Sequence, residues 1–301
     1  MTPARIVALS SLLWGSLLIA QQLPQIAYDV KESVVKIEVH LTNVHDSERV
    51  SDQLKRCFEE SDFCVIGTGV RINQAGDVLT AAHVARDTGV VSQTLKNIGI
   101  ESEVMVAGSA SNAEYVGGRV QSTGGASKAL IKAIDSEHDV AVLEPETGGQ
   151  AFERIDERTR ARKQDFREAK LDLQRPSLGE SIFSFGFPEY SPGLISTTGA
   201  ITLAVGSKNL VEAKKSGDTE LVPVYKAGLE MSPGNSGAPL FRTSDGALRG
   251  IVSEIAEGRD VIATVVPASE IAKVLSKYAI KWDAAPTAQA RSAGHKKLWP
   301  H

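Results

Sequence analysis

The 301-residue sequence is poor in cysteine and in aromatic residues: it holds two cysteines, Cys57 and Cys64, and its aromatic content is 5%. Two cysteines cannot supply a Cys-only structural zinc site, and they are too few for a scaffold held together by many disulfides. Stability must therefore come from a buried core, which a chain of this length can build as one large or two modest domains.

The sequence also lacks an excess of charge of one sign. Its 33 basic and 37 acidic residues leave a net charge of −4. No electrostatic feature therefore predicts binding to nucleic acid or to an anionic membrane surface. With 42% hydrophobic and 23% charged residues, the composition is that of an ordinary globular protein.

Long hydrophobic runs are missing except near the N-terminus. Arg5 precedes an apolar run over residues 6–20, which has the length of a signal-peptide core but falls short of the roughly 20 residues that span a membrane. We expect residues 1–27 to be a signal peptide or an N-terminal anchor, so that the protein is periplasmic or secreted. The alternative is a buried N-terminal helix. No clean small-x-small cleavage site follows the run, which leaves cleavage open.

Export would make the two cysteines relevant to stability. In an oxidising compartment, Cys57 and Cys64 can close a small local loop. Loop entropy predicts a stabilisation of roughly 2 to 3 kcal/mol for such a disulfide. The alternative is a pair of free thiols.

Many short β-like runs follow along the chain. Residues 33–41 alternate between apolar and polar side chains, as expected of a strand with one buried face. Residues 65–72 and 77–83 flank a Gly-containing connection and predict a hairpin. Many short strands with turns between them predict an all-β sandwich or barrel. Further runs lie at 102–107, 118–122, 139–143, 181–186, 199–205, 222–226, 240–243, 248–252 and 261–265.

Two segments depart from the β pattern. Residues 152–171 carry interleaved charges and no Gly or Pro, which predicts a solvated helix rather than a nucleic-acid patch. Residues 268–277 place apolar residues at helical spacing, with Ser269 available as a cap. Residues 284–301 lack periodicity and are expected to be a disordered tail.

Three motifs carry residues suited to nucleophilic catalysis. They centre on His83, Asp139 and Ser236. Each has a structural explanation when taken alone, because a histidine near a strand end, an acid heading a strand and a serine in a tight turn are all common. Together they supply what a serine nucleophile needs: an imidazole to take its proton, and an acid to orient that imidazole.

The serine lies in the segment 233–237, Pro-Gly-Asn-Ser-Gly. A tight turn of this composition can direct the backbone N–H groups of Gly234 and Ser236 toward one point. A developing oxyanion would be stabilised at that point. We therefore assign Gly234, Asn235 and Ser236 to a candidate oxyanion hole.

At these motifs the sequence resembles the trypsin-like serine peptidases, in particular the HtrA (Deg) proteases. The resemblance implies two antiparallel β-barrels with the active site between them. It also implies a Ser-His-Asp triad of the chymotrypsin type. It places the first barrel in residues 28–151 and the second, with a terminal helix, in 172–283. The matching segments are 67–69, 80–83, 139–143, 178–188, 198–201, 233–237 and 250–253.

The sequence departs from digestive trypsins at several places. Val84 stands where those enzymes have a half-cystine, and Asn235 stands where they have an acid that receives the new N-terminus on activation. These differences imply that the usual disulfide is absent and that activation of that kind does not occur. Only 26 residues follow Leu275, so the resemblance is to a protease domain without a PDZ domain.

The resemblance also implies a substrate pocket formed by Glu230, Met231 and Ser253. Glu230 falls at the pocket base in an ungapped count, where a carboxylate would pair with a basic P1 side chain. A buried carboxylate needs such a cation, whereas a Glu turned to solvent leaves Met231 to line an apolar pocket. We favour the apolar pocket.

The leading hypothesis is an exported serine endopeptidase acting on proteins or peptides, without a cofactor. The alternatives are an esterase that uses the same triad and a catalytically silent relative that binds peptides. A metal site built from His40, His45 or His83 is disfavoured because no H-E-x-x-H motif or Cys and His cluster is present.

Overall fold

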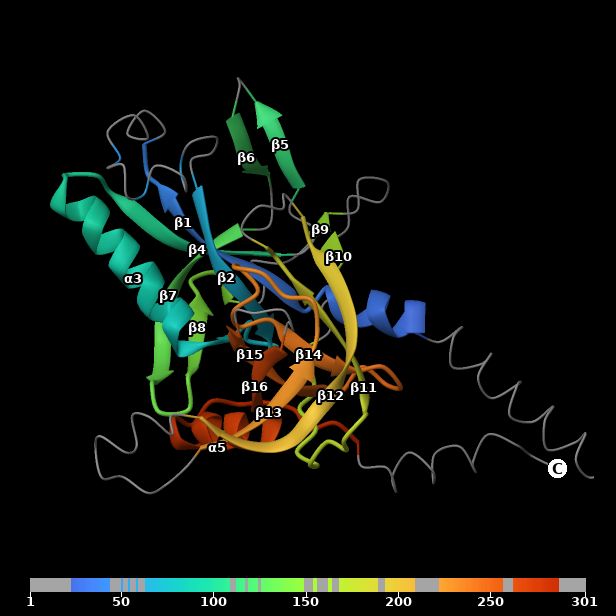
Figure 1. Ribbon diagram of the computed structural model, residues 1–301. Helices are drawn as coiled ribbons and strands as arrows, with labels where there is room; N and C mark the ends of the chain where they lie inside the picture. The colour runs from blue at the N-terminus through green and yellow to red at the C-terminus, as the bar shows by residue number, and fades with distance from the viewer. Residues whose placement is uncertain are drawn as a thin grey trace, which may run out of the picture.

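The computed structural model contains two closed, six-stranded antiparallel barrels (Figure 1), which confirms the predicted fold class. Most of the barrel strands overlap a predicted run but extend beyond it, and residues 126–135 form a strand where none was predicted. The structure describes residues 23–43, 50, 54, 58, 63–108, 112–116, 119–123, 126–148, 154–155, 162–163, 168–188, 193–208, 222–256 and 262–286.

The first barrel closes in the order β1-β2-β3-β8-β7-β4. Its interior is filled mainly by small and β-branched side chains, among them Val35, Ile37 and Ala141. Such side chains pack well on a pleated surface with a narrow interior. The strands are β1 (Val34–Leu41), β2 (Phe63–Arg71), β3 (Val78–Thr80), β4 (Ser102–Gly108), β7 (Ala126–Asp135) and β8 (Val140–Pro145).

The second barrel closes in the order β11-β12-β13-β16-β15-β14. Its interior is more varied and includes Tyr225, Leu240 and Val265. The strands are β11 (Ser181–Gly186), β12 (Ile195–Lys208), β13 (Val222–Gly228), β14 (Pro239–Arg242), β15 (Leu248–Ala256) and β16 (Ile262–Pro267).

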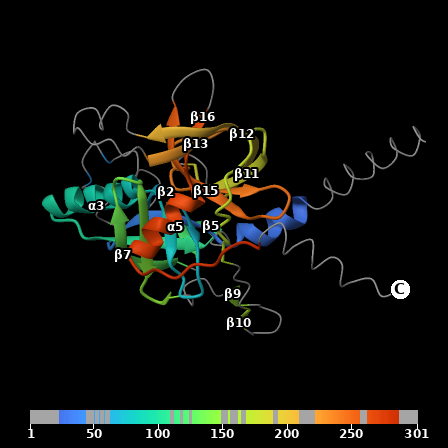
Figure 2. The ribbon, with the colours of Figure 1, turned by 90° about the horizontal axis from the view of Figure 1, so that it is seen from below.

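A shared hydrophobic cluster joins the barrels. It combines residues of the first barrel such as Val70 with Phe183 and Phe241 of the second and with the C-terminal helix α5 (Ala268–Lys277). Figure 2 shows α5 between β7 and the strands of the second barrel. Because this cluster draws on both barrels, it fixes how the two sit relative to each other.

The predicted helix at 268–277 is confirmed by α5, but its cap is not Ser269. The N-cap position is Pro267, which makes no side-chain capping bond. Instead, the helix gains its stability from a buried apolar face that includes Ile271 and Leu275.

The prediction that a strand extends to His83 is wrong, because β3 ends at Thr80 and helix α3 (Ala82–Asn97) begins two residues later. Ala has the highest helix propensity, and the buried residues Val84, Ala85 and Thr88 recur at helical spacing. Figure 1 shows α3 along the outside of the first barrel.

The predicted helix at 152–171 is wrong in the residues that the structure describes. Strand β9 (Arg154–Ile155) pairs with β10 (Arg162–Lys163), and residues 168–171 form no helix and end in bridges from Leu171 to Leu248 and Ala284. A charged segment without an apolar stripe has no helical face to bury. Strands β5 (Asn112–Val116) and β6 (Arg119–Thr123) form a separate ribbon, and only the second overlaps a predicted run, 118–122.

Near the N-terminus, residues 23–31 are helical. Leu23, Ile26 and Val30 pack against the shared cluster, so the predicted boundary at residue 27 falls inside an element that belongs to the core. Among the described helices, none combines the length and the apolar character needed to cross a bilayer. Residues 1–22 of the predicted leader, 1–27, and residues 287–301 of the predicted tail, 284–301, lie outside the described residues.

Candidate active site

His83 and Asp139 are hydrogen bonded to each other. The His83 ring Nδ1 lies 3.2 Å from Asp139 Oδ1 and 3.1 Å from Oδ2. The backbone N–H of His83 also donates to Oδ1, at 3.0 Å. A carboxylate accepts hydrogen bonds and does not donate them, so Nδ1 carries the proton and a neutral ring leaves Nε2 as an acceptor.

Asp139 is held in the turn between β7 and β8. It is 3% exposed and has a φ of 54°, in the left-handed region that Asp adopts more readily than most residues. Ser253 Oγ donates to Asp139 Oδ2 at 2.5 Å. The sequence predicted Ser253 as a pocket residue, and this link between the barrels was not predicted because the two residues are 114 positions apart.

Ser236 lies in the turn between β13 and β14. The N–H of Asn235 donates to Ser232 O at 3.0 Å, and the N–H of Ala238 donates to Asn235 O at 2.9 Å. Within the described part of the chain, no oxygen accepts a hydrogen bond from the N–H of Gly234 or of Ser236. These two groups are therefore free to act as donors. The N–H of Asn235, which was also predicted to belong to the oxyanion hole, already donates to Ser232 O.

Two glycines allow this turn to pack closely. Gly237 has a φ of 81°, and a Cβ there would clash with Thr68 O and Thr80 Oγ1. A Cβ at Gly186 would clash with the Asn235 side chain. The turn is therefore shaped by backbone that only glycine can supply at these points.

The segments that carry His83 and Ser236 meet at Gly67. A Cβ at Gly67 would lie 2.7 Å from Val84 Cγ1, in the residue after His83, and 3.0 Å from Ser236 O. Among the described residues, no hydrogen bond joins Ser236 Oγ to His83. Such bonds are often long in free enzymes and shorten when substrate binds.

The predicted pocket residues Glu230 and Met231 occupy different environments. Glu230 is exposed to solvent. Met231 is partly buried and packs against the apolar interior of the second barrel. Of the two residues, Met231 is thus the one that can line an apolar site.

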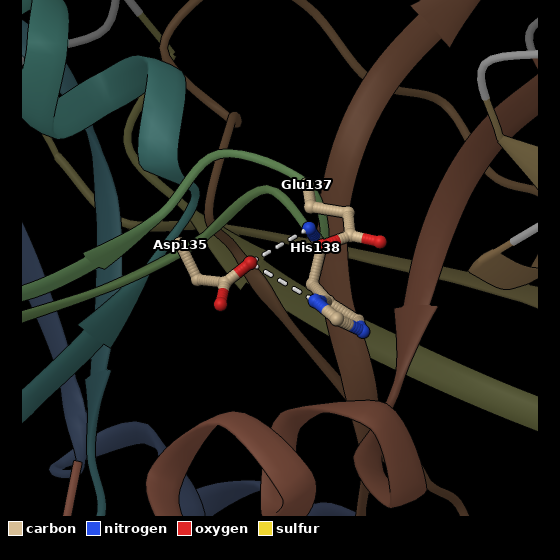
Figure 3. A group of neighbouring side chains, drawn as sticks. All are labelled: Asp135, Glu137 and His138. Carbon is tan, nitrogen blue, oxygen red and sulfur yellow. Dashed lines mark hydrogen bonds and ion pairs between the residues drawn. The ribbon is translucent and has the colours of Figure 1, made fainter. Parts of the chain in front are cut away.

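Beside Asp139 lies a charged group formed by Asp135, Glu137 and His138 (Figure 3). His138 donates to Asp135 Oδ1 through its backbone N–H at 3.1 Å and through ring Nδ1 at 2.9 Å. Lys277 of α5 donates to Asp135 Oδ2 at 2.8 Å. His138 thus lies in a turn and not on a strand, and both Asp135 oxygens already have partners.

These contacts set the charge state of Asp135. Its burial would raise the pKa, but the hydrogen bonds from Lys277 and His138 outweigh that effect and lower the pKa to about 2. The carboxylate therefore stays ionised at neutral pH and ties the turn before Asp139 to α5.

The histidines considered as metal ligands do not come together in the described residues. His40 Nε2 lies 2.8 Å from the buried carboxylate of Glu38, and His83 is bonded to Asp139. His45 lies outside the described residues, as does Cys57. Cys64 is buried, and the Cys57–Cys64 disulfide stays a prediction.

The comparisons with known proteins agree with this geometry. Residues 67–251 match the family model of the trypsin-like peptidase domain. No curated protein matches the chain in sequence.

Two solved structures are similar in fold. The HtrA-type protease AlgW with decapeptide matches with a TM-score of 0.55 and 18% identity, covering 85% of this chain and 67% of that one. An inactive form of Rv3671c from M. tuberculosis H37Rv, a serine-to-alanine mutant, matches with a TM-score of 0.50 and 19% identity, covering 84% of this chain and 90% of that one.

Proposed function

Since the chain belongs to the trypsin-like peptidase family, we propose that it is a serine endopeptidase that works through Ser236, His83 and Asp139. The observation that carries the proposal is the hydrogen-bonded pair of His83 and Asp139. With the Nδ1 proton directed at Asp139, Nε2 is the nitrogen of the neutral ring that can accept a proton, as a general base must.

The proposed reaction begins when Ser236 Oγ attacks the peptide carbonyl carbon and His83 Nε2 takes the hydroxyl proton. His83 then gives this proton to the leaving amine, and water hydrolyses the acyl-enzyme in a second, equivalent step. Asp139 is 3% exposed, so its charge is little screened by water, and it stabilises the imidazolium that forms in each step.

The negative oxygen of each tetrahedral intermediate would be bound by the N–H groups of Gly234 and Ser236. Both lack an acceptor among the described residues. Donors that are already fixed in place need no reorganisation when the charge develops, and for this reason they lower the barrier more than water does.

For the P1 side chain, we propose an apolar preference. Met231 packs on the apolar interior of the second barrel, and Glu230 is exposed. A solvated carboxylate attracts a cation weakly because water screens its charge, so a basic P1 residue would gain little from Glu230.

Export to the periplasm or the exterior also belongs to the proposal. It is supported by the apolar run at residues 6–20 and by the two cysteines that an oxidising compartment would allow to pair. The described helix at 23–31 would then be the first element of the exported domain.

Labelling with a fluorophosphonate, combined with hydrolysis of an apolar-P1 peptide, tests the proposed chemistry. We expect the wild type to be labelled, and Ser236→Ala to lose labelling and at least about a thousandfold of kcat. A wild type that binds the peptide but is neither labelled nor active would instead favour a catalytically silent peptide-binding protein. Activity retained by Ser236→Ala would exclude Ser236 as the nucleophile.

A further inference from the structure

Thr68 is a fully buried residue of the first barrel that contacts the turn of the second barrel. It lies on β2, opposite Lys36 of β1, and its side chain is 0% exposed. Its hydroxyl donates to Gly234 O at 2.8 Å and accepts from the N–H of Phe187 at 3.0 Å. The hydroxyl therefore uses both its donor and an acceptor lone pair on the second barrel.

The backbone of Thr68 adds two more bonds. Its N–H donates to Ser236 O at 2.9 Å, and its carbonyl accepts from Thr80 Oγ1 at 2.8 Å. The residue is thus anchored within its own barrel by Thr80 and reaches the carbonyls of both candidate oxyanion donors, Gly234 and Ser236.

These bonds fix two peptide planes of the turn at both ends. The carbonyl of Gly234 is held by Thr68, and the N–H of the same peptide, from Asn235, donates to Ser232 O. The carbonyl of Ser236 is also held by Thr68, and the N–H of that peptide, from Gly237, donates to Val252 O at 2.8 Å. Because a peptide is planar, a plane held at both ends cannot rotate without breaking a bond.

The two candidate oxyanion donors belong to neighbouring peptides. The Ser236 N–H lies in the peptide between the two fixed planes, and the Gly234 N–H lies in the peptide before the first of them. The Ser236 N–H belongs to the peptide whose carbonyl, Asn235 O, accepts from Ala238, so it points away from that bond. Gly234 has a φ of 93° and no side chain to restrict it. Its N–H belongs to the preceding peptide, joined to the following one through the φ and ψ bonds of Gly234, so the bond from Thr68 to Gly234 O restrains the N–H through the peptide plane that it fixes.

From this geometry, we infer that Thr68 is a positioning residue that holds Gly234 and Ser236 in the conformation that binds the oxyanion. The inference rests on the proposed function. Thr68 would not contact the substrate itself. It would act through the turn, so its loss should slow the chemical step and leave substrate binding nearly unchanged.

The test compares Thr68→Val, which loses the hydroxyl at nearly constant shape, with Thr68→Ser, which keeps it. We expect kcat of Thr68→Val to fall about 10- to 100-fold with KM within about twofold, since small misplacement of an oxyanion donor has effects of this size. Thr68→Ser should recover kcat to within about threefold of the wild type. Affinity for a peptidyl boronic acid, which forms a tetrahedral adduct, should fall in parallel with kcat.

Thr88→Val provides the matched control. Thr88 is also a fully buried threonine, but its hydroxyl donates to Ala85 O within its own helix, at 2.7 Å. It should lose a similar amount of stability and keep kcat within about twofold. Thr68→Ala serves as a second variant if Thr68→Val does not fold, and the same fall in kcat is expected.

The outcomes separate this inference from the proposed function. Wild-type kcat in Thr68→Val or Thr68→Ala, or a Thr68→Ser variant as slow as either, would overturn the positioning role. If Ser236→Ala is inactive at the same time, the proposed function stands and only the inference fails. If Ser236→Ala is active, the proposed nucleophile itself is wrong.

Discussion

The turn that carries Ser236 and the turn that carries Asp139 are held by different kinds of contact. The Ser236 turn is fixed by uncharged groups: backbone hydrogen bonds, the hydroxyl of Thr68 and the close approach allowed by Gly237. The Asp139 turn is fixed by charged groups, because Asp135 bonds to His138 and to Lys277. We therefore expect the geometry of the first turn to be independent of pH and that of the second to depend on it.

The difference follows from the tasks of the two turns. The Ser236 turn must present N–H groups to a negative charge, and a fixed charge close by would compete with them or oppose them. The Asp139 turn must hold one carboxylate beside a histidine, and Asp135, which precedes it, is paired with Lys277 of α5. The Ser236 turn is thus held by uncharged groups, whereas the Asp139 turn includes an ion pair with α5.

The largest effect is expected from Gly237→Ala, which disrupts the uncharged turn. The added Cβ would require a φ of 81° in a residue with a side chain and would clash with Thr68 O. We expect a loss of more than about 2 kcal/mol of unfolding free energy and a fall of at least about 100-fold in kcat. Urea unfolding and peptide hydrolysis measure both.

Gly89→Ala is the matched control for that variant. A Cβ at Gly89 meets no atom within 4 Å, and the residue lies inside helix α3. Alanine there should stabilise the protein by up to about 1 kcal/mol without changing kcat. If Gly237→Ala and Gly89→Ala had the same unfolding free energy and the same kcat, the Ser236 turn would not depend on the close packing at Gly237.

A smaller and pH-dependent effect is expected from Asp135→Asn, which removes the central charge of the second turn. The pKa of Asp135 is about 2 in the folded protein, below its ordinary value of 3.8. A carboxyl whose pKa is lower in the folded state stabilises that state at pH values above its pKa in the unfolded state. This contribution is lost as the pH falls from about 4 to about 2. We expect the variant to lose about 1 to 2 kcal/mol at pH 7.

The measurement is urea unfolding of both proteins at several pH values between 7 and 2. The difference between wild type and Asp135→Asn should shrink steadily below about pH 4. Asp87→Asn, which replaces an exposed acid of α3, should show no such difference. A difference that stays constant down to pH 2 would mean that the charge of Asp135 does not stabilise the turn.

The fold and the three candidate catalytic residues were largely accessible from the sequence, for different reasons. Strands show alternating or continuous apolar runs, and the residues around His83, Asp139 and Ser236 form short local motifs. The contacts of Thr68 were not accessible, because 166 positions separate it from Gly234. No local pattern records which backbone atoms another barrel will approach.

The errors have local physical causes. Residues 82–97 contain too few apolar residues to show a strong helical stripe, yet α3 forms because the first barrel covers Val84, Ala85 and Leu95. The sequence 152–171 has interleaved charges but no apolar stripe for a helix to bury, and residues 154–155 and 162–163 pair as short strands. In both cases the presence or absence of a buried apolar face decided whether a helix formed.

The smallest effect is expected from Glu230→Gln, which tests whether charge near the Ser236 turn matters at all. Glu230 lies two residues before Ser232 but is exposed, and water screens its field. We expect kcat/KM to change less than about twofold for matched peptides with Val, Ala or Arg at P1, and the Val peptide to be cleaved best because Met231 contacts the apolar interior. A strong preference for Arg that collapses in Glu230→Gln would place the carboxylate at the base of the pocket. It would also show that a charge next to the Ser236 turn takes part in substrate binding, which would weaken the contrast with the Asp139 turn.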